Sequence, residues 1–171
     1  MERARRGDFF GGIRILEQAA EQGHLDAMLV ASSMLIDGTY YEQGLAWLDK
    51  AVATGAPKAR LEMVKLLLAR DPEVQRPAEE AIPLLDALVS ENYAPALHLR
   101  AAQAEAGNVP YEQDIALAVR LYTRAAEQGF SPAMDRLADA YRKGELGLPV
   151  DLQQAEKWEQ QKEGALSQPE A

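Results

Sequence analysis

Residues 19–28 read Ala-Ala-Glu-Gln-Gly-His-Leu-Asp-Ala-Met and residues 125–134 read Ala-Ala-Glu-Gln-Gly-Phe-Ser-Pro-Ala-Met, so seven of the ten positions are identical. In each copy an alanine-rich segment ends in glycine, and a new segment then starts with alanine and methionine. A glycine at such a position is typical of a helix end, so each copy predicts one helix, a turn and the next helix. The repetition indicates an array of helical repeats.

Glycine and proline mark the predicted helix boundaries along the whole chain. The first helices of the repeats align on Ala27, Ala59, Ala96 and Ala133. Four residues before them stand Gly23, Gly55, Asn92 and Gly129. Glycine and asparagine are the residues that most readily adopt the left-handed conformation that ends a helix. Prolines at positions 57, 95 and 132 suit the first turn of a helix, where a missing N–H loses no hydrogen bond.

The first helices are predicted to end eleven residues after the starting alanines, at Gly38, Arg70, Gly107 and Gly144. Arg70 stands where the other three repeats have glycine. Pro72 and Pro77 follow it, and proline cannot continue a helix, so we expect the helix to end there as well.

The second helices share a small residue followed three residues later by a large apolar one. The small residues are Gly12, Gly44, Ala81, Ala118 and Ala155, and the large ones are Ile15, Trp47, Leu84, Leu121 and Trp158. Residues three apart lie on one helix face, so this face is predicted to pack in the core. Asp8, Asp114 and Asp151 precede these helices at positions where a carboxylate caps a helix start.

These signals predict an all-α fold of about four helix pairs plus an N-terminal helix. The predicted elements are a helix at 8–22 and the pairs 27–37 with 42–54, 57–69 with 78–91, 95–106 with 113–128, and 132–143 with 152–163. One solenoid is expected over residues 8–164, with flexible ends at 1–7 and 165–171 because both carry little apolar content.

Charge and composition exclude several classes of partner. The net charge is −9, from 27 acidic and 18 basic residues, which disfavours nucleic acid because phosphate binding needs clustered Lys and Arg. No apolar stretch reaches the length that a membrane-spanning helix requires, so membrane insertion is not expected. The charged start of the chain is unlike a signal peptide and favours the cytoplasm, with the periplasm as the alternative for an excised fragment.

The last repeat resembles a Sel1-like repeat, a short relative of the tetratricopeptide repeat, in its pattern Ala133-x3-Leu137-Ala138-x2-Tyr141-x2-Gly144-x2-Gly147 and then Asp151-x3-Ala155-x2-Trp158. The resemblance covers residues 8–164 and departs from the family pattern at Arg70 and Asn92. It implies a right-handed α-α superhelix that serves as an adaptor or scaffold for another protein or peptide. It also implies, as alternatives, an immunity or inhibitor protein for a secreted bacterial toxin, or a scaffold in exopolysaccharide and envelope assembly. No catalytic residues accompany the resemblance.

Residue chemistry favours a non-enzymatic function with no metal or cofactor. The chain has no cysteine, and neither His24 nor His98 has a second histidine one helical turn away. An enzyme acting on envelope polymers is the alternative, but no nucleophile and base can be paired. Trp47 and Trp158 share one register, which favours core packing over ligand stacking.

Partner binding is predicted on the first helices, which line the concave side of such superhelices. The positions outside the core spacing are Ser33, Glu62, Lys65, His98, Gln103, Arg136, Asp139 and Lys143. Their mixed charges favour a polar groove that suits a protein or peptide. Self-association through the ends of the array is a second interface that the sequence leaves open.

Overall fold

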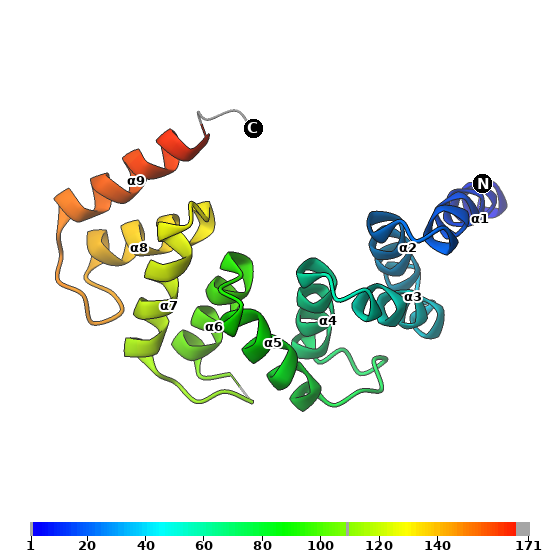
Figure 1. The fold of residues 1–171 in the computed structure, drawn as a ribbon, viewed down its shortest axis with the longest axis horizontal. Helices are drawn as coiled ribbons and strands as arrows, with labels where there is room; N and C mark the ends of the chain where they lie inside the picture. Colours follow the sequence, from blue (N-terminus) through cyan, green and yellow to red (C-terminus); the bar gives the residue numbers. More distant parts are fainter. Residues whose placement is uncertain (1, 109, 167–171) are drawn as a thin grey trace. The chain divides into compact units, whose positions relative to one another are not determined.

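The structure is a computed structural model that describes residues 2–108 and 110–166, with side chains at 10–108 and 110–165. Every regular element in the described residues is a helix, and no strand occurs there. The elements are α1 (Glu2–Glu21), α2 (Leu25–Asp37), α3 (Tyr41–Ala53), α4 (Pro57–Ala69), the 3-10 helix η1 (Ala78–Glu80), α5 (Ala81–Ser90), α6 (Ala94–Ala106), α7 (Ile115–Glu127), α8 (Ser131–Lys143) and α9 (Leu152–Leu166). The predicted all-α fold is confirmed (Figure 1). Three of the predicted pairs pack as expected, α2 with α3, α6 with α7 and α8 with α9, whereas the helix predicted at 78–91 is divided into η1 and α5.

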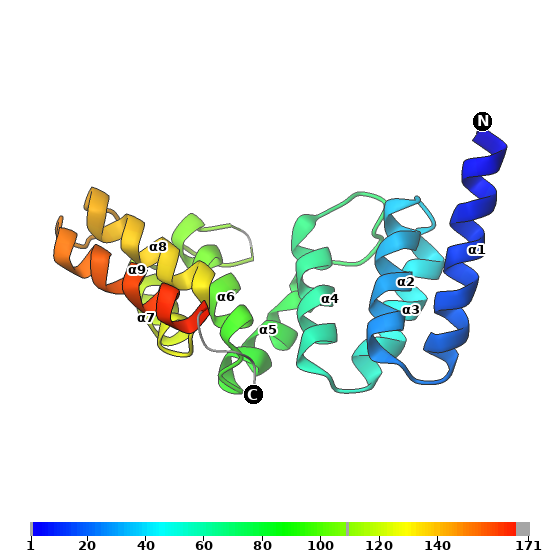
Figure 2. The same ribbon diagram turned by 90° about the horizontal axis from the view of Figure 1, so that it is seen from above.

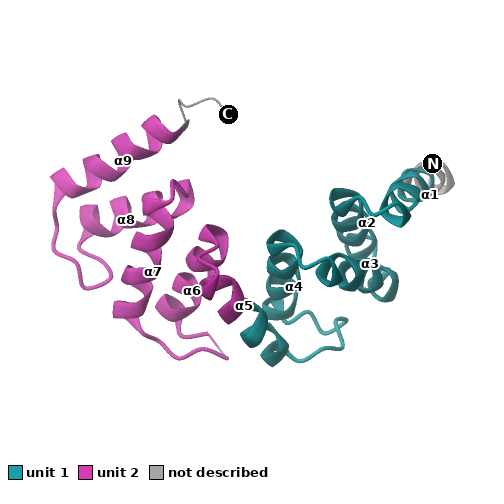
Figure 3. Cartoon of the chain, in the orientation of Figure 1, with its two compact units in different colours: residues 1–84 teal, residues 85–171 magenta. Residues whose placement is uncertain are grey.

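The helices form two compact units, residues 1–84 and residues 85–171, and the boundary lies within α5 (Figure 3). In the first unit α2 packs against both α1 and α3, and α3 continues to α4 (Figure 2). In the second unit α7 packs between α6 and α8, and α9 packs on α8. Each unit is therefore built from consecutive helices that contact their neighbours in sequence. The end segment from residue 167 lies outside the described residues.

The predicted left-handed helix ends are present between repeats. The φ angles are +91° at Gly23, +79° at Gly55, +58° at Asn92 and +84° at Gly129. Ends of first helices differ in detail from the prediction at two places. Gly38 has φ −80° and the following Thr39 takes the left-handed conformation, with φ 69°. Arg70 is itself left-handed, with φ 54°, so this helix ends by the same geometry as its neighbours despite lacking glycine.

Two of the three predicted aspartate caps are confirmed. Asp114 Oδ1 accepts a hydrogen bond of 2.8 Å from the Leu117 N–H, and Asp151 Oδ1 accepts one of 3.0 Å from the Gln154 N–H. The prediction for Asp8 is wrong, because α1 begins at Glu2 and Asp8 lies inside it. The preceding segment contains alanine, glutamate and arginine, which are favourable in helices and extend α1 beyond its predicted start.

The face predicted to pack in the core is buried in most repeats. The residue at position 44 must be small, because a Cβ there would lie 2.6 Å from Ile36 Cγ1 and 2.9 Å from the Ser32 carbonyl oxygen. Gly12, in the same register on α1, faces open space. Ile15 is the exception among the large residues at 70% exposed, because α1 packs through Ile13 and no described helix covers the opposite side.

Trp47 is confirmed as a core residue. Its side chain is 7% exposed and belongs to the core of the first unit. The indole N–H donates to Glu17 Oε1 at 3.2 Å, and Lys50 Nζ lies 3.9 Å from the ring centroid. Trp158 is half-buried against the core of the second unit and also borders an open surface pocket.

Candidate functional site

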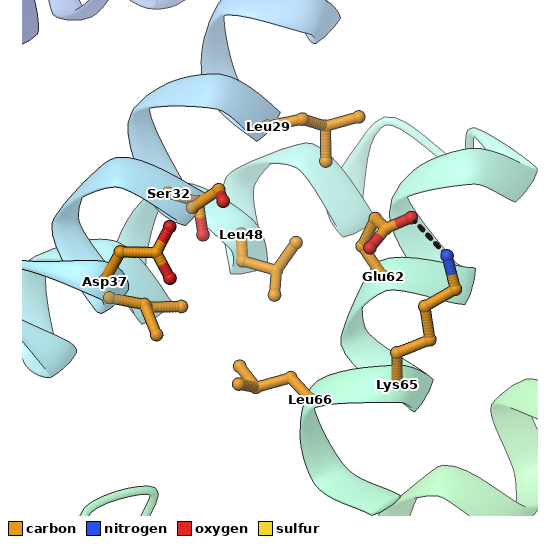
Figure 4. Close-up of a pocket in the computed structure, with 9 residues that line it drawn as sticks. Leu29, Ser32, Asp37, Leu48, Glu62, Lys65 and Leu66 are labelled. Carbon is orange, nitrogen blue, oxygen red and sulfur yellow. Dashed lines mark hydrogen bonds and ion pairs between the residues drawn. The ribbon is translucent and has the colours of Figure 1, made fainter. Parts of the chain in front are cut away.

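A groove in the first unit is bordered by the first helices of two successive repeats, α2 and α4, with α3 beneath it (Figure 4). Its volume is about 300 Å³. We call it the α2–α4 groove, and it is lined by Leu29, Ser32, Ser33, Ile36, Asp37, Leu48, Glu62, Lys65 and Leu66. Such a volume is at the small end of ligand-binding cavities, which accommodates one or two large side chains.

The base of the groove is apolar and its rim is charged. Leu48 from α3 lies between the two walls and is only 3% exposed. Asp37 ends the α2 wall, and Glu62 and Lys65 lie on the α4 wall. Lys65 Nζ donates to Glu62 Oε1 at 2.9 Å. An apolar base with a few polar groups at the rim is the usual composition of a recognition site in proteins.

A second depression extends the groove along the same two helices. It has a volume of about 310 Å³ and shares Leu29, Ser33 and Glu62 with the first. Its lining includes an exposed ion pair between Lys58 Nζ and Asp26 Oδ1, 2.7 Å apart. The hydrogen bond from Lys58 lowers the pKa of Asp26. Together the two depressions form a continuous surface between α2 and α4.

Three of the residues predicted for binding line this groove: Ser33, Glu62 and Lys65. Ser33 and Lys65 are exposed and Glu62 is half-buried. They come from two different repeats, and the packing of α2 and α4 brings them to one surface. Contact of these residues with a partner stays a prediction.

His98 and Arg136 instead belong to a polar cluster in the second unit. Arg136 on α8 donates to Glu105 on α6 from Nη2 at 2.5 Å and from Nε at 3.2 Å, and to Glu145 from Nη1 at 2.8 Å. Tyr122 on α7 donates its hydroxyl to Glu105 at 2.8 Å. His98 packs edge-on against Tyr122, with ring centroids 5.3 Å apart. These side chains are therefore engaged within the chain.

The contacts in this cluster shift the pKa values of its members. Hydrogen bonds from Arg136 lower the pKa of Glu105, and the hydrogen bond to Glu105 raises the pKa of Arg136. Burial raises the pKa of the Tyr122 hydroxyl, and its hydrogen bond to Glu105 adds to this. Burial lowers the pKa of His98. The cluster therefore holds a charged Arg–Glu pair beside a neutral histidine and phenol near neutral pH.

The other three predicted residues lie outside both clusters. Asp139 accepts a hydrogen bond of 2.9 Å from Arg142, and Lys143 Nζ lies 4.0 Å from its other oxygen. Gln103 is half-buried on α6, and its side chain has no hydrogen-bond partner in the part of the chain that the structure describes. None of these three borders the α2–α4 groove.

Sequence reasoning missed the apolar base of the groove and Asp37. Leu48 follows Gly44 by one helical turn, so its spacing indicated only a core position. Asp37 is the last residue of α2 and was not among the predicted positions, although it lies outside the core spacing. Asp37 stands ten residues after Ala27, as Lys143 does after Ala133, so the register that selected Lys143 would also have selected Asp37. Glu105 and Tyr122 were missed because only packing brings α6, α7 and α8 together.

The described residues contain no group of three or more His, Asp or Glu side chains that could hold a metal ion. None of the described helices is both long and apolar enough to cross a membrane.

The Sel1 repeat family matches this chain at residues 8–24, 96–130 and 131–160. These matches include the last repeat, in which the family pattern is most complete. Residues 25–95, which contain the α2–α4 groove, lie between the matched segments. The groove is therefore built from repeats whose sequence departs from the family pattern. No curated protein matches the sequence of the chain.

Three solved structures with similar folds share fewer than one residue in four with this chain. A Sel1 repeat protein from Oxalobacter formigenes superposes with a TM-score of 0.70 at 24% identity, over 90% of this chain and 63% of that one. A protective antigen of uropathogenic Escherichia coli, described as an SLR fold, superposes with a TM-score of 0.69 at 22% identity, over 89% of this chain and 33% of that one. An immunity protein from Pseudomonas aeruginosa superposes with a TM-score of 0.56 at 19% identity, over 90% of this chain and 73% of that one. The chain thus spans less than two thirds of the first two proteins.

Proposed function

Because this chain is a Sel1-like repeat protein, we propose that it is a non-enzymatic interaction module whose α2–α4 groove receives a segment of another protein. The observation that carries the proposal is the open groove between the first helices of successive repeats. Sel1 repeats generally bind proteins, and the groove combines an apolar base with a charged rim. Burying one large apolar side chain there would contribute about 2 kcal/mol to binding.

The proposal is supported by the contrast between the two units. In the second unit the side chains between the first helices α6 and α8 are joined by hydrogen bonds through Glu105 and Arg136. In the first unit the equivalent surface has a charged rim that is open to solvent, with Lys65 exposed. An external partner can therefore reach the part of the first surface that lies over Leu48 without breaking the Asp26–Lys58 ion pair, which lies outside the lining of that part.

A peptide library displayed on phage tests the proposal directly. We would select 12-residue peptides on the full chain and measure their affinity for the Ser33→Trp variant. Ser33 is exposed and borders both depressions, so tryptophan there fills the groove without changing the core. Ala46→Trp is the matched control, since Ala46 is exposed on α3 and borders none of these depressions.

We expect peptides that bind the parent chain and the Ala46→Trp variant and lose at least tenfold in affinity for Ser33→Trp. Peptides that bind all three proteins equally would show that recognition occurs elsewhere. A selection that enriches no peptide would also count against the groove as a peptide-binding surface.

A second candidate function is inhibition of a secreted toxin, as in an immunity protein. The observation that favours it is the similarity to the Pseudomonas aeruginosa immunity protein, which covers 90% of this chain. The test is co-expression of this chain with the products of the genes that flank its own. Rescue of growth from one toxic product by the parent chain would support inhibition, and growth arrest in every combination would contradict it.

A further inference from the structure

Equivalent positions in the two units differ in a way that defines the chemistry of the α2–α4 groove. Counting from the starting alanine of each first helix, Ile36 on α2 is equivalent to Glu105 on α6, and Glu62 on α4 is equivalent to Arg136 on α8. On the second helix, Leu48 and Tyr122 both stand four residues after the small residue. Three residues that line the groove thus correspond to three members of the hydrogen-bonded cluster.

In the second unit, side chains of the cluster occupy the region between α6 and α8 that corresponds to the α2–α4 groove. Glu105 receives the Tyr122 hydroxyl at 2.8 Å and the Arg136 Nη2 at 2.5 Å. At the equivalent positions of the first unit, leucine replaces the tyrosine and isoleucine replaces the glutamate. The phenol, the guanidinium and their acceptor are therefore all missing there, and a cavity of about 300 Å³ with an apolar base takes their place. An apolar group fits this base, since a buried polar group would find no partner on Leu48 or Ile36.

On the charged rim, the carboxylate of Asp37 has no pairing partner among the described residues. Glu62 is paired with Lys65 at 2.9 Å, and Asp26 is paired with Lys58 at 2.7 Å. Asp37 is exposed, and in the part of the chain that the structure describes its carboxylate has neither an ion pair nor a hydrogen bond. A cation on a bound segment would thus find its most available acceptor at Asp37.

The surroundings of Asp37 are acidic. Tyr41, at the start of α3, donates its hydroxyl to Asp71 Oδ2 at 2.9 Å. The pKa of Tyr41 is raised first by this hydrogen bond and further by the charges of Asp71, Glu73 and Asp37. The carboxylates of Asp37, Asp71 and Glu73 therefore all act on the Tyr41 hydroxyl, which lies outside the groove lining, four residues along the chain from Asp37. Their negative potential favours a basic residue on the partner.

We infer that the occupant of the α2–α4 groove is a protein segment that places a bulky apolar side chain on Leu48 and a lysine or arginine beside Asp37. The inference rests on the proposed function and adds the chemical class of the bound segment. The apolar anchor supplies the burial and the cation fixes the direction in which the segment lies.

The same peptide selection tests the inference, now with the Asp37→Lys variant as a second target. Peptides enriched on the parent chain should contain a leucine, methionine or aromatic residue with lysine or arginine a few positions away. On Asp37→Lys, the basic residue should be replaced by glutamate or aspartate. Glu156→Lys is the matched control, because it makes the same charge change at an exposed position on α9 and should leave the peptide sequences unchanged.

Binding measurements on one enriched peptide complete the test. We expect Asp37→Asn to weaken it about two- to fivefold at low salt, and 0.5 M NaCl to remove most of this difference. If Ser33→Trp abolishes binding but Asp37→Lys and Asp37→Asn change neither sequence preference nor affinity, the groove binds peptides and the inferred cation is wrong. If Ser33→Trp has no effect, the proposed function itself fails. Enriched peptides without a bulky apolar residue would contradict the inferred apolar anchor on Leu48.

Discussion

Arg136 on α8 holds Glu105 on α6 by two hydrogen bonds, from Nη2 at 2.5 Å and from Nε at 3.2 Å, so one guanidinium joins the first helices of two successive repeats. The Arg136 side chain is 23% exposed and the Glu105 side chain is 28% exposed. Partial burial reduces solvent screening, and the bidentate geometry strengthens the pair. This contact joins α6 to α8 and pairs the two charges within the chain.

Removal of this contact should destabilise the chain measurably. We expect Arg136→Ala to lower the free energy of unfolding by about 2–3 kcal/mol, because Glu105 would be left partly buried without its cation. Arg136→Lys should recover part of the loss, since lysine keeps the charge but cannot donate two hydrogen bonds in parallel. Denaturation in urea, followed by circular dichroism, measures these differences.

Lys143→Ala is the control for this prediction. Lys143 is exposed, and among the described residues its ion pair with Asp139 is long at 4.0 Å, so its loss should change the free energy of unfolding by less than about 0.5 kcal/mol. An equal loss in the Arg136→Ala and Lys143→Ala variants would contradict the structural role of the Arg136–Glu105 pair.

Stability should fall as the pH decreases, in two stages. Burial lowers the pKa of His98 below its ordinary value of 6.5, so the unfolded chain binds a proton before the folded chain does. Stability from the neutral imidazole is therefore complete above pH 6.5 and is lost as the pH falls through the lower pKa of the folded chain. Glu105, whose pKa lies below its ordinary value of 4.5, causes a second loss below that pH.

Urea denaturation between pH 3 and pH 8 tests both stages. His98→Gln should flatten the curve just below pH 6.5, where each proton contributes a slope of at most about 1.4 kcal/mol per pH unit. Glu105→Gln should reduce the loss below pH 4.5. A His98→Gln curve that runs parallel to that of the parent chain throughout would contradict the first assignment.

Two glycines at the same register should respond in opposite ways to alanine. Gly44→Ala places a Cβ 2.6 Å from Ile36 Cγ1 and 2.9 Å from the Ser32 carbonyl oxygen, so α2 and α3 must separate. We expect a loss of about 1–3 kcal/mol in the free energy of unfolding. Gly12→Ala meets no atom within 4 Å and should gain up to about 1 kcal/mol from helix propensity. Thermal or urea denaturation shows whether each variant gains or loses free energy of unfolding. A destabilised Gly12→Ala variant would contradict the open space found around Gly12 on α1.

The cluster of the second unit can be transferred to the first. Replacement of Ile36, Leu48 and Glu62 by glutamate, tyrosine and arginine reproduces the residues found at Glu105, Tyr122 and Arg136. We expect this triple variant to keep its helical circular dichroism and to lose affinity for groove-binding peptides, because the cavity is then filled from within.

The control for the transfer is the triple variant Ile36→Leu, Leu48→Met and Glu62→Gln, which changes the same positions and leaves the groove unfilled. It should bind those peptides within a few-fold of the parent chain. A transferred cluster that folds and still binds with unchanged affinity would show that the peptides do not use the groove.

Much of the fold was predictable because its signals are local. Gly23, Gly55 and Gly129 adopt the left-handed conformation at helix ends. Asp114 caps the start of α7, and Asp151 caps the start of α9. The errors arose where the signal depended on neighbours. Ile15 repeats the register of Trp47, but it is exposed because no described helix covers that side of α1.

The candidate site was predicted only in part for the same reason. Ser33, Glu62 and Lys65 were identified by their spacing, and they line the groove. Arg136 was identified by the same spacing and is engaged with Glu105 instead. Spacing gives the face of a helix but not the side chains that the neighbouring helix brings to it.

By itself, the sequence determined the order of helices and turns in this protein, because helix propensity, capping and glycine or proline punctuation act within a few residues. It also determined the register of small and large residues, since that register repeats with the helical period. Only the tertiary structure decided which surface is open. The contacts of Glu105, Tyr122 and Arg136 join three helices in one unit, and Leu48 with Ile36 leaves a cavity in the other. That outcome depends on side-chain volume and hydrogen bonding between helices distant in sequence, which become neighbours only after packing.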